Sequence, residues 1–306
     1  MDIAGWASDS AARIRADGID GVRESIRPVY HKGLQSLSDL RDPGVPIYER
    51  DWDLLIVVDA CRLDLMHELA PGYDFIDSVS EFRSLDSMTR LWMVKNFVPD
   101  YADEMAETAY VCGNPFSKDA LNADQFLELD EVWQYVWEQP GTVPPRAITD
   151  RTISVARNHQ PDRLIAHYMQ PHCPFISRPD LTQGKRLDRF GNQEWDDVWQ
   201  KLRAGKLTRE EVWAGYQENL ELALDEVALL LENVDADRAV ITSDHGNALG
   251  EWFVYGHPPT MPLDCLRTVP WIETTGVDRG THDPELEAET DVDTDRSEQL
   301  AALGYV

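Results

Sequence analysis

One stretch, residues 239–251, constrains the fold more than any other part of the chain. It begins with the apolar run Ala239-Val240-Ile241 and continues to Asp244-His245-Gly246. A run of apolar, β-branched residues predicts a strand of a parallel sheet that is buried on both faces. In open α/β sheets, functional groups lie just beyond the carboxyl ends of such strands. A carboxylate beside an imidazole at that point suits a divalent metal ion.

Two other segments repeat this arrangement of a buried strand followed by a polar side chain. Residues 53–59 contain five consecutive apolar residues and end at Asp59, and residues 163–169 lead to His172. The alternative role for Asp59 is to cap the helix that is predicted after it. Because parallel strands end at the same edge of a sheet, we expect both side chains to lie beside the Asp-His pair.

A hydroxyl-rich turn provides two candidate nucleophiles. Residues 84–89 contain Ser87 and Thr89 and lead into a predicted helix. A Ser or Thr at the start of a helix either caps it or acts as a nucleophile where backbone N–H groups attract an anion. The local sequence favours the cap. A further candidate, His257, lies in a Gly/Pro loop, where a histidine is not expected to fill the core, whereas His167 inside its strand is expected to be a core histidine.

Predicted strands alternate with predicted helices, which defines an α/β chain. Thr208–Glu211 form a capping box that begins a long helix, and this helix leads into the strand at 239–243. A second helix is predicted at 148–158, and shorter strands at 75–80 and 266–272.

The chain also has two segments outside this alternation. Residues 8–40 predict a helix whose apolar stripe, from Ile14 to Val29, packs on the main domain. The other interpretation is an amphipathic helix on a membrane surface, but its polar face is mixed in charge. The polar residues 178–207 are interpreted as an insertion or lid that contributes to the choice of substrate.

The charge of the chain excludes one class of function. Its 306 residues include 56 acidic and 28 basic side chains, a formal net charge of −28. We prefer to interpret this excess as a surface adapted to high salt, the alternatives being an acidic tail or a basic partner. The excess also argues against nucleic-acid binding, which needs a basic patch. No apolar window is long enough to span a membrane. The four cysteines are far apart in sequence and no signal peptide is evident, so we expect reduced thiols and a cytoplasmic protein.

Five motifs in order resemble the sulfatase-like branch of the alkaline phosphatase superfamily. They are Leu55–Asp64, Pro171–Phe175, Thr242–Gly246, Tyr255-Gly256-His257 and Gln299–Tyr305. The resemblance implies an α/β domain over residues 46–306, with a mostly parallel central sheet between two layers of helices. Residues 1–45 lie outside it and are expected to form a helical extension.

The resemblance also implies a metal site. The metal ligands are Asp59, Asp244 and His245, and the nucleophile also touches the metal. His172 and His257 either contact the transferred group or bind a second metal. The Asp-x-x-x-His pattern of a full second site is missing around His172. We therefore expect one divalent ion, and the sequence does not distinguish between Mn, Zn, Ca and Mg as its identity.

One departure from the family pattern bears on the reaction. Formylglycine sulfatases carry a C/S-x-P-x-R motif, and Ser87-Met88-Thr89-Arg90 lacks its proline and spacing. A hydroxyl that attacks the ester directly is similar to the nucleophile of the phosphodiesterase and phosphoglycerol-transferase members. We therefore prefer Thr89 over Ser87 as the nucleophile, and we expect Thr89 to be a metal ligand as well. The expected activity is metal-dependent hydrolysis or transfer of a phosphate or sulfate ester through a covalent Thr/Ser intermediate.

The substrate is expected to be a small ester or a glycan- or lipid-linked one, and the oligomeric state is not predicted. The alternative is a catalytically weakened member of the family that binds a glycan, a lipid head group or a partner protein.

Overall fold

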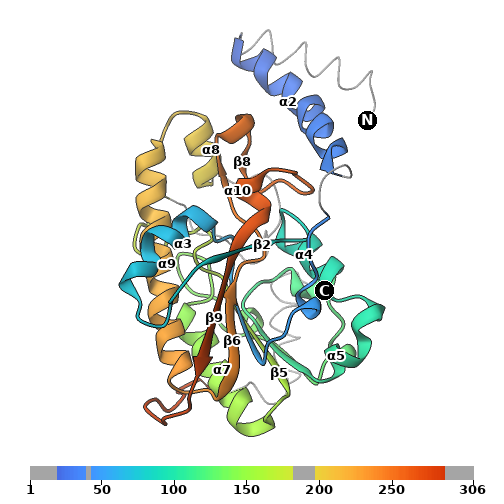
Figure 1. Ribbon diagram of the computed structural model, residues 1–306. Helices are drawn as coiled ribbons and strands as arrows, with labels where there is room; N and C mark the ends of the chain where they lie inside the picture. The colour runs from blue at the N-terminus through green and yellow to red at the C-terminus, as the bar shows by residue number, and fades with distance from the viewer. Residues whose placement is uncertain (1–18, 39–42, 182–196, 287–306) are drawn as a thin grey trace, which may run out of the picture.

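A seven-stranded sheet lies at the centre of the protein, in the order β2-β9-β6-β1-β5-β3-β4. The computed structural model describes residues 19–38, 43–181 and 197–286 (Figure 1). The strands are β1 (Leu54–Val58), β2 (Ser80–Arg83), β3 (Thr108–Cys112), β4 (Glu128–Glu131), β5 (Arg163–Tyr168), β6 (Ala236–Thr242) and β9 (Thr268–Gly276), with β7 (Ala248–Leu249) and β8 (Tyr255–Gly256) as a separate pair. Neighbouring strands from β6 to β4 are parallel, whereas β9 is antiparallel to β6 and β2. The sheet is therefore mostly parallel, as predicted.

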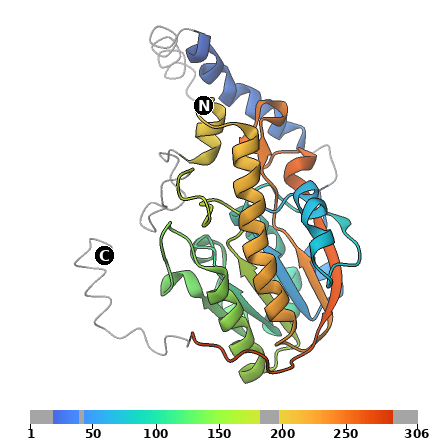
Figure 2. The same ribbon diagram turned by 90° about the vertical axis from the view of Figure 1, so that its left-hand side faces the viewer.

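Helices cover both faces of this sheet and give three layers (Figure 1), and Figure 2 looks onto the helices of one layer. The helices are α2 (Ile19–Ser36), α3 (Leu63–Leu69), α4 (Thr89–Asn96), α5 (Ala102–Ala106), α6 (Ser117–Ala120), α7 (Pro145–His159), α8 (Val198–Arg203), α9 (Arg209–Leu231) and α10 (Asp264–Arg267). Successive side chains of a strand point to opposite faces. Leu54, Ile56 and Val58 of β1 accordingly join the core under α3, α7 and α9, while Leu55 and Val57 join the core under α4 and α5. The predicted α/β sandwich is confirmed.

The register of the central strands brings their carboxyl ends to one level. Val58 of β1 is paired with Tyr168 of β5, and Val57 is paired with Thr242 of β6. The residues that follow these strands therefore emerge at the same edge, where the sequence places its polar groups.

Most of the predicted elements are present, with two differences in the strands. The capping box at Thr208 and Glu211 begins α9, and α7 covers the predicted helix at 148–158. The strand predicted at 75–80 lies instead at β2. Strand β4 was not predicted, because the residues Glu-Leu-Asp-Glu have low strand propensity. The strand forms the edge of the sheet beside β3.

The N-terminal helix is oriented differently from the prediction. The exposed fractions of Val22, Ile26 and Val29 are 37%, 55% and 48%, so this apolar stripe does not pack on the domain. The helix contacts the domain through Leu34, which packs on the small apolar cluster around Met261, and through Gln35, whose Nε2 donates to Pro259 O at 2.9 Å. Within the described part of the chain, no helix is long and apolar enough to cross a membrane.

Three predicted segments lie partly or wholly outside the described residues. These are the start of the N-terminal helix, the middle of the polar insertion at 182–196, and the closing motif Gln299–Tyr305. The described end of the insertion forms α8, which lies close to β8.

Candidate metal centre and active site

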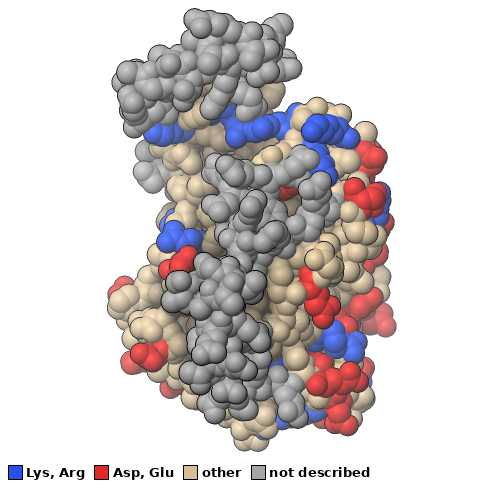
Figure 3. Space-filling model, turned by 180° about the vertical axis from the view of Figure 1, so that it is seen from behind, with Lys and Arg blue, Asp and Glu red and all other residues tan. Residues whose placement is uncertain are grey.

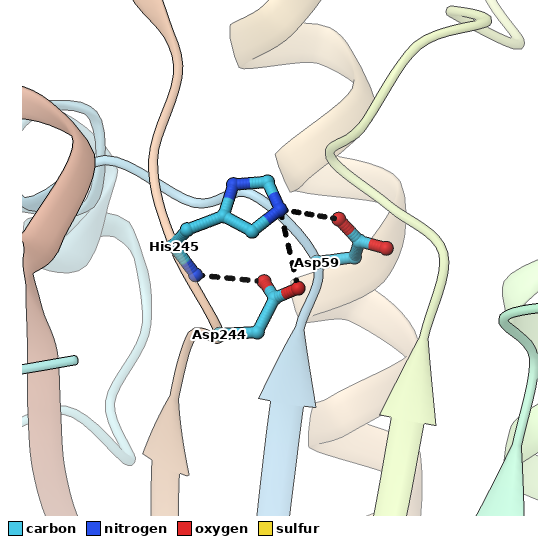
Figure 4. Close-up of side chains that lie close together, drawn as sticks. All are labelled: Asp59, Asp244 and His245. Carbon is cyan, nitrogen blue, oxygen red and sulfur yellow. Dashed lines mark hydrogen bonds and ion pairs between the residues drawn. The ribbon is translucent and has the colours of Figure 1, made fainter. Parts of the chain in front are cut away.

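Three buried side chains converge beyond the ends of β1 and β6 (Figure 4). Asp59 follows β1 directly, and Asp244 and His245 follow β6 after one residue. His245 Nε2 lies 3.3 Å from Asp244 Oδ2 and 3.9 Å from Asp59 Oδ1. The potential ligand atoms of all three residues lie within 4.8 Å of one another. This is the constellation that the strand ends predicted.

Hydrogen bonds from the backbone fix the orientation of the Asp244 carboxylate. Its Oδ1 accepts from the N–H groups of Ala60, at 2.8 Å, and His245, at 2.9 Å. The chain turns sharply at Ala60, whose φ of 63° is uncommon for a residue with a side chain. Oδ2 then faces His245, is buried, and accepts no hydrogen bond from the residues that the structure describes.

The imidazole of His245 is held in the orientation that a metal ligand needs. Its Nδ1 lies 2.9 Å from Gly246 O, so a proton on Nδ1 donates to this carbonyl. The lone pair of Nε2 then faces the two carboxylates, the usual arrangement in which an outer partner fixes the tautomer of a ligating histidine. Two buried carboxylates without a cation are costly. The orphaned Asp244 Oδ2 and this donor set together fit a divalent ion.

Thr89 is placed at the same point by α4. It is the first residue of the helix, and its Oγ1 lies 3.1 Å from His245 Nε2. Met88 is the N-cap and makes no side-chain cap bond, so the Thr89 hydroxyl is not used as a cap. The N–H groups of the first helical turn lack helical partners and favour an anion beside them.

Ser87 lies close in sequence, but its hydroxyl has a different environment. Its Oγ donates to Pro258 O at 2.6 Å and accepts from Met261 N at 2.8 Å. Ser87 thus connects the start of α4 to the loop after His257, and the structure brings Thr89, rather than Ser87, against the ligand cluster.

The two remaining predicted histidines lie on the open side of this cluster. The Nε2 atoms of His172 and His257 are 2.9 Å apart. The His257 ring stacks on His245, with centroids 4.5 Å apart. The backbone N–H of His172 donates to the backbone O of Asp59 at 3.0 Å, which connects this histidine to the first candidate ligand. Both histidines, together with Asp59 and Thr89, line a cavity of about 710 Å³. They are therefore positioned to touch a molecule that binds in this cavity.

Sequence reasoning missed Asn114, which holds the first carboxylate. Its Nδ2 donates to Asp59 Oδ2 at 2.6 Å, and its side chain is buried. Asn114 follows β3 after one residue, at the same edge of the sheet as the candidate metal ligands. A polar side chain just after a buried strand was the signal that identified Asp59, and Asn114 carries the same signal after β3.

Replacing Asn114 by alanine is expected to weaken metal binding by about 10–100-fold, the usual effect of losing an outer partner of a ligand. Titration of the metal-free protein with Zn²⁺ or Mn²⁺ in a calorimeter measures this. N122A, which removes an exposed capping side chain, is the matched control. Unchanged affinity in N114A would show that Asp59 does not depend on this bond.

Arg62 is a second residue that sequence reasoning left without a role. Its guanidinium is buried and donates to Asn247 O, Asp64 and Glu251. Burial opposes its charge, but the hydrogen bond and negative charge of Asp64 outweigh this and raise the pKa of Arg62. Arg62 thereby connects the turn after Asp59 to the loop that follows the Asp-His pair.

His167 is a core residue, as predicted. It is fully buried in β5, and the Tyr110 hydroxyl lies 2.7 Å from its Nδ1. Burial lowers the pKa of His167 to about 4, so this imidazole is neutral at physiological pH. It is therefore separate from the histidines that face the cavity.

Comparison with known proteins identifies the fold. No family model and no curated protein matches the sequence. Among solved structures, the integral membrane lipooligosaccharide phosphoethanolamine transferase A of Neisseria meningitidis has a TM-score of 0.50 and 15% identity, with coverage of 90% of this chain and 60% of that chain. The soluble domain of the same transferase has a TM-score of 0.47 and 15% identity, with coverage of 75% and 77%. An alkaline phosphatase superfamily protein from Vibrio parahaemolyticus has a TM-score of 0.38 and 10% identity, with coverage of 81% and 69%.

The α/β fold of this chain is therefore similar to that of the N. meningitidis transferase. The chain spans 60% of the length of the full N. meningitidis transferase, and at 15% identity the likeness describes the fold alone.

Proposed function

We propose that the protein is a metal-dependent hydrolase or transferase of a phosphate or sulfate ester that acts through a covalent intermediate on Thr89. The observation that carries this proposal is the position of the Thr89 hydroxyl. It lies at a helix N-terminus, 3.1 Å from a histidine that faces two buried carboxylates. A nucleophile, a cation site and an anion-favouring helix end thus coincide at one wall of the cavity.

Each of the surrounding groups has a role in such a reaction. When bound by Asp59, Asp244 and His245, a divalent cation supplies Lewis acidity toward an ester oxygen. Thr89 Oγ1 releases its proton to the solvent and forms a bond to the phosphorus or sulfur atom, while the bond to the leaving oxygen breaks. His172 or His257 gives a proton to that oxygen. Water or an acceptor hydroxyl then gives its proton to that histidine and attacks the same atom, and the released Thr89 Oγ1 takes up a proton from the solvent.

The substrate is proposed from the size of the site and from similar structures. A solved structure of similar fold is a lipooligosaccharide phosphoethanolamine transferase, which supports a glycan- or lipid-linked ester as the substrate here. A cytoplasmic location and a surface adapted to high salt stay predictions from the sequence.

The test is an activity assay with the cation as a controlled variable. The protein is stripped of metal and supplied with Mn²⁺, Zn²⁺, Ca²⁺ or Mg²⁺ singly, and tested on p-nitrophenyl phosphate, bis(p-nitrophenyl) phosphate and p-nitrophenyl sulfate. We expect one cation to restore hydrolysis of at least one ester, with an adduct on the peptide that contains Thr89. Absence of both turnover and metal binding would contradict the proposal and favour a binding protein without catalysis.

A further inference from the structure

The N-terminal helix α2 directs a polar stripe into the cavity that contains Thr89. Arg27, His31 and Gln35 follow one another at a spacing of four residues and all line this cavity. Residues with this spacing share one face of a helix. The opposite stripe of Val22, Ile26 and Val29 is exposed. A helix that only packs on a domain buries its apolar stripe. Helix α2 instead turns its polar stripe toward the cavity, so we interpret these polar residues as the functional ones.

A second helix completes this wall. Arg203 and Gln200 of α8 line the same cavity, and buried Trp199 anchors α8 beside them. The acidic residue of this wall, Asp197, is the N-cap of α8, and its side chain accepts from Gln200 N at 2.8 Å. Two guanidinium groups from separate helices thus line the same cavity as the candidate nucleophile.

The two arginines of this wall belong to a chain that is strongly acidic. The chain carries a net charge of −28, with twice as many acidic as basic residues. From behind, Lys and Arg atoms gather in the upper part of the molecule near α2, whereas Asp and Glu gather along one side (Figure 3). Apart from the ligand Asp59, Asp197 is the acidic residue among the described residues that line the cavity.

The size of the cavity leaves room for more than the reacting group. Its volume of about 710 Å³ is typical of sites that enclose a whole small molecule. A phosphate or sulfate at Thr89 occupies a small part of this space. The remaining part, between α2 and α8, therefore receives the portion of the substrate that does not react.

We propose that α2 and α8 form a second anion-binding subsite, in which Arg27 and Arg203 receive a negatively charged group on the non-reacting part of the substrate. Guanidinium groups bind phosphate and carboxylate through paired hydrogen bonds, which suits this role. The inference rests on the proposed function and narrows it, because it defines the substrate as an ester with a second anionic group.

The test compares ligands that differ by one terminal charge. Alkylphosphonates of increasing length are paired with ω-carboxyalkylphosphonates of the same length, and their binding to the Zn²⁺- or Mn²⁺-loaded full chain is measured by calorimetry. At a matching length, the carboxylate is expected to tighten binding at least about tenfold, the contribution of a charge-assisted hydrogen bond. R27Q and R203Q are expected to lose this gain and to bind plain alkylphosphonates as the parent does.

The controls separate the subsite from the reaction. R238Q removes an exposed arginine near Asp53 and is expected to keep the full gain, while R27K and R203K keep part of it. Melting temperatures establish that each variant is folded. If the terminal carboxylate gives no gain at any length, or an equal gain in R27Q and R203Q, the subsite is wrong. A retained gain in a protein without turnover would uphold the subsite and contradict the proposed reaction.

Discussion

The variant D244N is expected to lose metal binding, with an affinity reduced by more than about 100-fold. Loss of an outer partner alone costs about 10–100-fold, and Asp244 is a proposed direct ligand whose Oδ2 faces the site. A cation at about 100 times its Kd for the parent should stabilise the parent by about 2.7 kcal/mol and D244N by less than about 0.4 kcal/mol. Calorimetry and metal-dependent melting temperatures measure the two effects independently of turnover.

The metal-free D244N protein is expected to fold, because the substitution keeps the shape of the side chain and removes one of two neighbouring buried negative charges. The matched control is D264N, which makes the same chemical change at an exposed carboxylate paired with Arg83. It should bind metal as the parent does. Parent-like affinity in D244N would refute the assignment of this carboxylate as a ligand.

The variant T89V is expected to lower kcat by at least about 10³-fold, which corresponds to about 4 kcal/mol of transition-state stabilisation. Valine fills nearly the same buried space but has no hydroxyl to attack the ester. T89S restores a hydroxyl and should keep activity within about tenfold of the parent. Metal affinity, measured beside kcat, distinguishes a lost nucleophile from a lost ligand.

Ser87 provides the decisive control, since it is the other hydroxyl of the same turn. S87A removes the bonds to Pro258 and Met261, each worth about 1 kcal/mol, so stability should fall while catalysis persists. If S87A were inactive at full metal loading and T89V active, Ser87 would be the nucleophile instead.

The sequence predicted the centre of the fold well because local and tertiary preferences agree there. The apolar runs of β1, β5 and β6 belong to fully buried strands, and their parallel register places the residues after them at one edge. Asp59 and the Asp-His pair meet for that reason. Residues that directly follow neighbouring parallel strands can thus be predicted to lie together wherever the sequence identifies those strands clearly.

Prediction from the sequence was less successful where long-range contacts decide the structure. The β4 strand has a sequence with low strand propensity and exists because β3 offers it a partner. The hydroxyl of Ser87 is directed by a loop more than 170 residues away, which no local pattern reports. The stripe of α2 was assigned to the core from its apolarity, while the contact that holds the helix comes from Leu34 and Gln35.

The position of α2 has a consequence for which parts of the protein a substitution affects. The candidate metal ligands lie at strand ends in the buried core, where most substitutions disturb the packing. The helix that lines part of the opposite wall belongs to the N-terminal segment before the sheet, and its contacts with the domain include those of Leu34 and Gln35. Substitutions in the helix can therefore alter the proposed anion subsite while the candidate metal ligands stay in place. Under the proposed function, the segment that selects the substrate is thus separate from the residues that react with it.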